Sequence, residues 1–435
     1  MAHVDEPAPT PYAPPEAGTV TAYRNATLID GTGGPARPGT TIVVDGDVII
    51  EVIPDGDATI PDGVAAVDVG GAYVIPGLID SHQHLATPPN RPVAEAALRR
   101  QVYGGVTAIR DMADDLRQIA DLTRATRIGE IPGPDIHYAS LMAGPSFFDD
   151  PRTWQVSQGG TPGHVPWMQA IDDDTDLPLA VAMARGTHAT AIKVYAELPG
   201  TTVAAITAEA KRQGIGVWAH AAVFPATPAQ VVASGVDAVS HVTLLAQETA
   251  DEPLTSYKTK APIDVERLVD KGDPRLDALY ALMRQRGTVL DATGSMWTWM
   301  AEKADDADGK ARALANDALS AKLTGDAYRA GVLVSAGTDY ETDPAHPFPS
   351  LHAEMLFLAE RCGIPAEQVI RCATQVGAMS MGAQDVMGTV EAGKLANFVV
   401  LARDPRADMA NLDSIEYTVK RGRRFDRGDF RKDEQ

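Results

Sequence analysis

Through the middle of the chain, apolar runs with strand-like alternation are followed repeatedly by stretches with apolar residues three or four positions apart. The first pattern predicts strands and the second predicts amphipathic helices. Eight strands are predicted, ending near His84, Met112, Ser140, Lys193, His220, His241, Thr293 and Asp339. The predicted helices include residues 93–103, 177–185, 203–213, 228–234, 276–286 and 310–330. Such units close into a (β/α)8 barrel, so the predicted fold class is α/β with a TIM-like barrel.

Both ends of the chain show a different pattern. Short β-branched runs near the N-terminus are separated by Asp-Gly pairs that predict hairpins, namely Asp45-Gly46, Asp55-Gly56 and Asp62-Gly63. Similar short β-branched runs occur near the C-terminus at residues 388–390, 398–401 and 417–419. We therefore expect both ends to form one small antiparallel β-sandwich module. The predicted organisation is a disordered tail at 1–19, a composite module of 20–75 and 384–428, and a barrel of 76–383.

Composition narrows the class of protein. The chain has 435 residues, of which 44% are hydrophobic, so it can bury a large core. A formal net charge of −21 disfavours nucleic acid and anionic membranes as partners. There is no apolar run of about 18 residues that could cross a bilayer, and residues 1–18 lack the regions of a signal peptide. We expect a cytoplasmic protein, without a disulfide framework because only Cys362 and Cys372 are present.

Metal-competent side chains stand where the predicted strands end. His82 and His84 follow an apolar run and, two apart on extended backbone, point the same way. Each of His220 and His241 closes a further run. Alone, any of these imidazoles is equally consistent with a core or surface histidine. The carboxyl ends of barrel strands meet at one mouth, however, so their joint placement favours a metal site.

Two further strand ends carry charge. Lys193 interrupts an apolar strand, where an ammonium is costly unless it is paired or modified. The alternative is a lysine that reaches the rim of the barrel. Asp339 ends the last strand and is either a metal ligand or a cap of the next turn.

Two segments carry a resemblance to a known family. Residues 76–84, PGLIDSHQH, resemble the opening motif of the amidohydrolase superfamily. Residues 388–401, GTVEAGKLANFVVL, resemble the segment with which chains of that superfamily return from the barrel to the β module. The likeness covers about residues 20–424 and is to the binuclear subtype with a carbamylated lysine. Within the superfamily, the chain looks most like the imidazolonepropionase-related branch that includes metal-dependent dipeptidases and ochratoxin-type amidases.

The resemblance implies a role for each candidate. His82, His84 and Asp339 would bind one divalent ion, and His220 and His241 the other, with a carbamate on Lys193 and a hydroxide bridging them. Two ions about 3.5 to 4 Å apart acidify the shared water and polarise a carbonyl. Asp339 would be the catalytic proton shuttle. Zinc is the first expectation from the nitrogen-rich ligand set, and a homo-oligomer is expected because the family is often multimeric.

Two long loops and a few side chains are candidates for binding the substrate. Residues 143–176 and 246–273 form long connections, which at this end of a barrel are usually lids or substrate walls. Candidate substrate contacts are Tyr195, two residues beyond Lys193, His164 on the first long loop, and Trp297 after the seventh strand. No basic residue follows His220 closely, and this departs from what a strict dipeptidase needs for a free carboxylate.

These observations predict a metal-dependent hydrolase of an amide-type bond in a small molecule with an apolar or aromatic group. The same centre could instead open a lactone, a cyclic amide or a carbamate. A mononuclear ring hydrolase or deaminase is a third possibility, and it would not need Lys193. An inactive binding protein with structural metals is a fourth, which the retention of all six centre residues disfavours.

Overall fold

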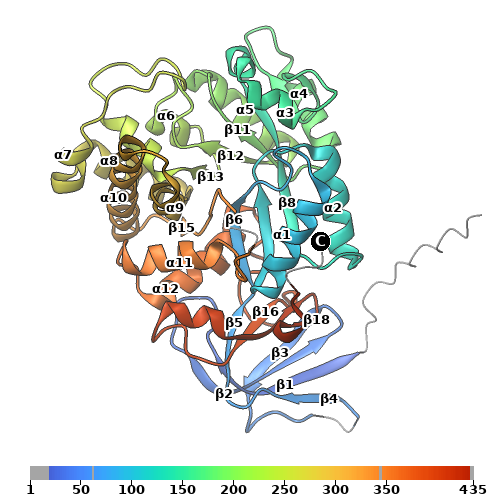
Figure 1. The fold of residues 1–435 in the computed structure, drawn as a ribbon. Coiled ribbons are helices and arrows are strands. Elements are labelled where there is room, and N and C mark those ends of the chain that lie inside the picture. The colour runs from blue at the N-terminus through green and yellow to red at the C-terminus, as the bar shows by residue number, and fades with distance from the viewer. Residues whose placement is uncertain (1–18, 61–62, 342–344, 432–435) are drawn as a thin grey trace, which may run out of the picture.

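The chain forms a barrel of alternating strands and helices that stands on a separate sheet (Figure 1). The computed structural model describes residues 19–60, 63–341 and 345–431. The predicted tail at 1–19 therefore lies outside the described residues except for Thr19. The predicted fold class, an α/β barrel with a module built from both chain ends, is confirmed.

The separate sheet joins the two ends of the chain. Its eight strands follow the order β18-β17-β16-β5-β1-β2-β3, with β4 beside β1. They are β1 (Val20–Leu28), β2 (Arg37–Asp45), β3 (Val48–Pro54), β4 (Ala65–Asp68), β5 (Tyr73–Pro76), β16 (Phe398–Leu401), β17 (Ile415–Lys420) and β18 (Arg423–Asp426). The ends meet where β5 pairs antiparallel with β16, so that Ile75 lies opposite Val399. The sheet has its own apolar core, in which the rings of Tyr23 and Phe398 pack edge to face.

The module differs from the sequence prediction in strand direction. Asp45-Gly46 does form the hairpin between β2 and β3, with Gly46 at a φ of 58°. Asp55-Gly56 does not, because the chain beyond it crosses back and β4 pairs with β1 in parallel. β5 also runs parallel to β1, so the expectation of a purely antiparallel module is wrong. The pair Asp62-Gly63 lies partly outside the described residues.

The eight predicted barrel strands are present and parallel. They are β6 (Leu78–Gln83), β7 (Val106–Asp111), β8 (Asp135–Ala143), β11 (Ala191–Val194), β12 (Gly216–His220), β13 (Ala238–Ser240), β14 (Val289–Asp291) and β15 (Val334–Ser335). Each pairs with its neighbours in chain order from β6 to β15. Alternation along them explains which side chains reach the interior. In β11, Ile192 and Val194 pack outward against the helices, whereas Lys193 faces inward.

The seam between the last strand and the first is closed by a few bonds. The Ser81 amide donates to the Ala336 carbonyl at 2.8 Å, and the Asp339 amide donates to the His82 carbonyl at 2.9 Å. The buried carboxylate of Asp80 also accepts bonds from the amide and the hydroxyl of Thr338, at 3.1 and 2.9 Å. The barrel is thus closed next to two of the candidate ligands.

The helices cover the outside of the barrel (Figure 1). They are α1 (Arg91–Tyr103), α2 (Leu116–Ile128), α3 (Pro151–Val156), α4 (Leu177–Gly186), α5 (Gly200–Gln213), α6 (Pro228–Ala233), α7 (Val265–Lys271), α8 (Pro274–Arg286), α9 (Ser295–Lys303), α10 (Ala307–Arg329), α11 (Leu351–Glu360), α12 (Ala366–Arg371) and α13 (Gly377–Ser380). Short 3-10 or π turns are η1 (Pro145–Asp149), η2 (Val242–Thr249), η3 (Cys372–Val376), η4 (Met409–Ser414) and η5 (Arg427–Asp429). Aspartate caps set several starts: the Asp306 side chain accepts from the Gly309 amide at the start of α10.

Both predicted long loops contain structure of their own. The first carries η1, α3 and the short strands β9 (His164–Val165) and β10 (Met168–Ala170). The second carries η2 and α7. Among the described residues, no helix combines the length and apolar character needed to cross a membrane.

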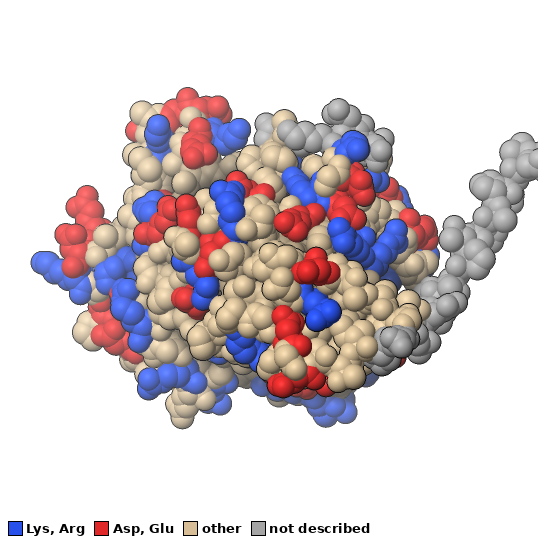
Figure 2. Space-filling view, turned by 90° about the horizontal axis from the view of Figure 1, so that it is seen from below, with Lys and Arg blue, Asp and Glu red and all other residues tan. Residues whose placement is uncertain are grey.

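The surface below the module carries both signs of charge. Figure 2 shows acidic and basic side chains interspersed over this face, among the residues that it colours by charge. The negative net charge is therefore not gathered there into one patch. The structure holds one chain, so the expected homo-oligomer stays a prediction.

Candidate metal centre

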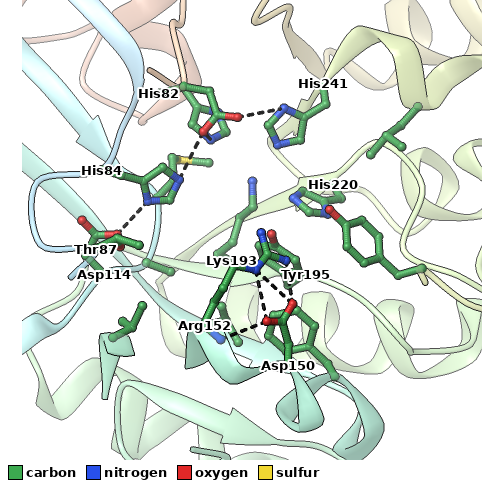
Figure 3. A pocket seen from close by; sticks show the side chains of 18 of the residues that line it. His82, His84, Thr87, Asp114, Asp150, Arg152, Lys193, Tyr195, His220 and His241 are labelled. Carbon is green, nitrogen blue, oxygen red and sulfur yellow. Dashed lines mark hydrogen bonds and ion pairs between the residues drawn. The ribbon is translucent and has the colours of Figure 1, made fainter. Parts of the chain in front are cut away.

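A cavity of about 520 Å³ opens at the carboxyl ends of the barrel strands. All six side chains predicted from strand ends line it: His82, His84, Lys193, His220, His241 and Asp339. Figure 3 shows that the four imidazoles and Lys193 point toward one another across this space. Strand ends spread over more than half of the sequence therefore converge, as the barrel pattern predicts.

The first ligand group consists of His82, His84 and Asp339. One candidate ligand atom from each of them lies within 4.8 Å of the others. The Nε2 atoms of His82 and His84 are each 3.4 Å from the same carboxylate oxygen of Asp339. Asp339 also approaches Nδ1 of His241 at 3.7 Å, so this carboxylate stands between three imidazoles.

Carboxylates behind the first ligand group fix its two rings. Nδ1 of His82 lies 2.7 Å from Asp291, and Nδ1 of His84 lies 2.7 Å from Asp114. An ionised carboxylate only accepts hydrogen bonds, so each Nδ1 is the donor, and each Nε2 faces Asp339 as the nitrogen that could bind an ion. This is the arrangement that orients metal-binding histidines in general.

Neither of these carboxylates was predicted from the sequence. Asp291 lies at the end of β14, and Asp114 lies just beyond β7. The available signal was an acidic residue at the carboxyl end of a barrel strand, the same signal that marked Asp339. A further buried residue, Arg110, donates to Asp291 at 3.2 Å and lies 4.7 Å from the ring centroid of Trp218. The floor of the site is thus a charged layer packed on an aromatic ring.

The second ligand group consists of Lys193, His220 and His241. The rings of His220 and His241 are 4.8 Å apart, and that of His241 is 4.8 Å from His82. Nδ1 of His241 lies 3.0 Å from the Thr293 hydroxyl. In contrast, neither Nζ of Lys193 nor Nδ1 of His220 has a hydrogen-bond partner among the described residues, although both atoms are buried.

Burial dominates the electrostatics of the second ligand group. It lowers the pKa of Lys193 to about 7 and that of His241 to about 3, and it lowers the pKa of His220 well below the usual value. In the first ligand group, burial also lowers the pKa of His84, but Asp114 and Asp339 outweigh it and raise the pKa well above its usual value. Burial acts to raise the pKa of Asp339, yet the surrounding imidazoles bring it below the usual range.

Several strand ends have a left-handed backbone. The φ values are 62° for Asp339, 70° for His241, 50° for Thr293 and 81° for Ala113, none of which is glycine. Such conformations cost on the order of 1–3 kcal/mol each and persist where the surrounding structure imposes them. Asp339 and His241, two of these residues, are candidate ligands that line the cavity.

The donor set fits divalent cations. Lone pairs of two imidazoles face one carboxylate oxygen in the first ligand group, which is repulsive unless a cation or a proton lies between them. Imidazole nitrogen and carboxylate oxygen are both common ligands of zinc-like ions. In the second ligand group, the unpartnered Lys193 amine and His220 nitrogen are buried polar atoms that need a partner.

The predicted substrate contacts fall in different places. Tyr195 and Trp297 both line the cavity, and the Tyr195 ring lies 4.0 Å from that of His220. His164 is exposed on β9 and is not among the residues that line the cavity. The remaining wall is largely apolar, with residues such as Met112, Leu141, Phe147, Val156, Leu244 and Met296.

A family model and several known proteins are similar to this chain. Residues 73–425 match the family model described as "Amidohydrolase family". An N-acyl-D-aspartate deacylase from Alcaligenes xylosoxydans xylosoxydans is 31% identical over 179 residues, which cover 38% of this chain and 31% of that protein. The match thus spans under a third of the length of this curated relative.

Solved structures resemble almost the whole chain. A Xaa-Pro dipeptidase with methionine bound in its active site has a TM-score of 0.73 and 22% identity, covering 94% of this chain and 100% of that one. The ochratoxinase of A. niger has a TM-score of 0.73 and 20% identity, with coverage of 94% and 96%. At these identities, the likeness establishes the fold.

Proposed function

Because the chain belongs to the amidohydrolase family, we propose that it is a metal-dependent hydrolase of an amide-type carbon–nitrogen bond in a small molecule with an apolar or aromatic group. The predicted family is confirmed by the match over residues 73–425. The reaction, the ligand roles and the substrate are the proposal, and they are supported by the cavity and its side chains.

One observation carries the proposal: the amine of Lys193 is buried in the centre and has no hydrogen-bond partner among the residues that the structure describes. A buried ammonium without a partner is costly, and burial lowers its pKa to about 7, so much of the amine is neutral. A neutral amine is the form that reacts with carbon dioxide. The amine nitrogen would bond to the carbon of carbon dioxide and release one proton to solvent, and the resulting carbamate would be an anion that offers two oxygen ligands.

The ligand groups can then be assigned to two ions. His82, His84 and Asp339 would hold one of them, and His220 and His241 the other, with carbamylated Lys193 between them. Zinc is the first candidate because the ligand set is rich in imidazole. Bound divalent ions would acidify a water molecule and polarise the scissile carbonyl.

We assign the proton transfer to Asp339. Its two carboxylate oxygens face three imidazoles, and about a fifth of its side chain, 19%, is exposed to the cavity. It would accept a proton from the attacking water and deliver it to the leaving nitrogen. The apolar wall beside it would accommodate the apolar group of the substrate, with Tyr195 and Trp297 in contact.

The names of the relatives favour amide-type bonds. One relative is an N-acyl-D-aspartate deacylase, and a structural neighbour is a Xaa-Pro dipeptidase. Other neighbours are a molinate hydrolase and a phenylurea hydrolase. These names support cleavage beside nitrogen more than the opening of a lactone.

The test is a substrate screen with two forms of the same protein. Protein loaded with zinc in bicarbonate is compared with chelated protein on N-acyl amino acids, dipeptides, aromatic amides, lactones and carbamates. We expect the loaded form to hydrolyse N-acyl or aromatic amides and the chelated form to be inactive. Faster turnover of lactones or carbamates would contradict the amide assignment. Inactivity toward all of them would favour the binding protein.

A further inference from the structure

The second long loop forms one wall of the cavity beside His220. Tyr257 and Lys260 of this loop line the cavity. The Tyr257 ring stacks on the His220 ring with centroids 5.6 Å apart. A contiguous path of side chains therefore runs from the second ligand group to Lys260.

Hydrogen bonds to Glu197 anchor this part of the loop. The Glu197 carboxylate accepts bonds from the Ser256 hydroxyl and the Tyr257 amide, both at 2.8 Å. Glu197 itself has a left-handed backbone, with a φ of 61°. Two part-buried hydrogen bonds therefore anchor the loop to Glu197 shortly before Lys260.

Lys260 has no acidic partner. Among the described residues, its ammonium takes part in no ion pair or hydrogen bond, and its contact is the face of the Tyr257 ring, 4.8 Å from the centroid. The side chain is exposed at the cavity opening, while the protein around it removes enough water to lower its pKa. An unpaired cation at this position is notable in a chain with a net charge of −21.

The other cation on this side of the cavity is already neutralised. Nε of Arg152 donates to both carboxylate oxygens of Asp150, at 3.1 and 3.0 Å, and a terminal nitrogen of Arg152 donates to Oδ2 at 2.6 Å (Figure 3). Such a bidentate pair leaves little net charge for a ligand. Beyond the ligand groups, Lys260 is therefore the uncompensated positive charge that the described cavity offers.

We propose that Lys260 binds a carboxylate of the substrate at the His220 side of the cavity, and so selects amides that carry a free carboxylate near the scissile bond. This inference rests on the proposed function. A dipeptidase needs a basic residue for a free carboxylate, and no such residue closely follows His220 in the sequence. The structure places a cation on that side from the next strand–helix connection instead.

The test compares matched substrate pairs. N-benzoyl derivatives of glycine, phenylalanine and proline are each assayed as the free carboxylate and as the carboxamide, with zinc-loaded protein. We expect wild type to prefer the carboxylates through KM. Lys260→Met should raise KM for the carboxylates by roughly tenfold, with kcat and the carboxamide KM nearly unchanged. Lys260→Arg should retain the preference, and Lys271→Met, an exposed lysine of the same loop, should match wild type.

Binding measurements distinguish failure of the Lys260 inference from failure of the proposed hydrolase function. Calorimetric titration of the same carboxylates and carboxamides into Asp339→Asn protein reports affinity without turnover. Equal KM and Kd values for both members of each pair, or no effect of Lys260→Met, would overturn the inference while hydrolysis still supports the proposed function. Carboxylate-selective binding that needs Lys260, without turnover in wild type, would support the inference and refute the reaction. Neither binding nor turnover would refute both.

Discussion

The two ligand groups of the centre are built in opposite ways. In the first, the rings of His82 and His84 are each held by a buried carboxylate at 2.7 Å, and Asp339 completes the set. In the second, Lys193 and His220 have buried nitrogen atoms without hydrogen-bond partners in the described part of the chain, and Nδ1 of His241 lies 3.0 Å from the Thr293 hydroxyl. The rings of the first group are oriented by carboxylates, whereas burial favours the neutral forms of the second group.

This difference suggests an order of assembly. The oriented group has a negative carboxylate and aligned lone pairs, so it attracts a cation directly. The second group consists of Lys193, His220 and His241, and it would gain an anion only if Lys193 were carbamylated. We therefore expect the first group to bind its ion more tightly and the second to depend on bicarbonate.

The largest effect is expected from removal of the amine that joins the groups. Lys193→Ala should lower metal content from about two ions per chain to about one, and activity by on the order of a thousandfold or more, because the second ion loses its bridging ligand. Elemental analysis and turnover after reconstitution with and without bicarbonate measure this. One ion and unchanged activity in the variant would favour the mononuclear alternative and erase the contrast between the groups.

Asp339→Asn should have the next largest effect. The amide keeps an oxygen for the first ion but cannot accept the proton, so metal should largely remain while kcat falls by on the order of a hundredfold or more. Stopped assays together with metal content measure the two properties separately. Activity near that of wild type would show that the proton is carried by another group.

Loss of an orienting carboxylate should be milder. Asp114→Asn keeps one acceptor oxygen, replaces the other with an amide NH2 and removes the charge behind His84, so affinity for the first ion should fall about 10- to 100-fold. Competition with a chelator measures the affinity. Asp115→Asn is the matched control, since this neighbouring buried acid caps α2 and pairs with Arg117. Equal affinity in both variants would mean that orientation by Asp114 is unimportant.

The smallest effect should come from the second group. Thr293→Val removes the neutral hydroxyl at Nδ1 of His241, a bond worth about 1 kcal/mol, or roughly fivefold in affinity for the second ion. Thr293→Ser restores the hydroxyl and should recover most of the loss. A Thr293 effect larger than that of Asp114 would reverse the proposed contrast in how the two groups are held.

The barrel and its ligand candidates could be predicted because both follow from periodic patterns. Strand alternation places Lys193 and His220 inside, and parallel strands bring their ends together. The predicted helix 276–286 differs from α8 only at its start, since the Asp273 cap and the following proline begin the helix two residues earlier. Ligand roles for the six residues stay a prediction until an ion is measured.

Contacts between distant residues were not predictable in this way. His82 and its partner Asp291 are 209 positions apart, and no local pattern encodes that distance. Lys260 lies in an irregular loop, where neither period nor motif indicates that it faces a cavity. Asp55-Gly56 misled because a turn signal specifies a reversal of the chain but not which strand the chain joins next.

The seam of the barrel connects the site to the integrity of the fold. Asp80, Ser81 and His82 from β6 meet Ala336, Thr338 and Asp339 from beyond β15 through few backbone bonds. An ion bound by both His82 and Asp339 would link the two sides of this seam, which are more than 250 residues apart in the sequence. Loss of the ion should accordingly loosen the closure first, and amide hydrogens of β6 would exchange faster while those of β12 keep their protection.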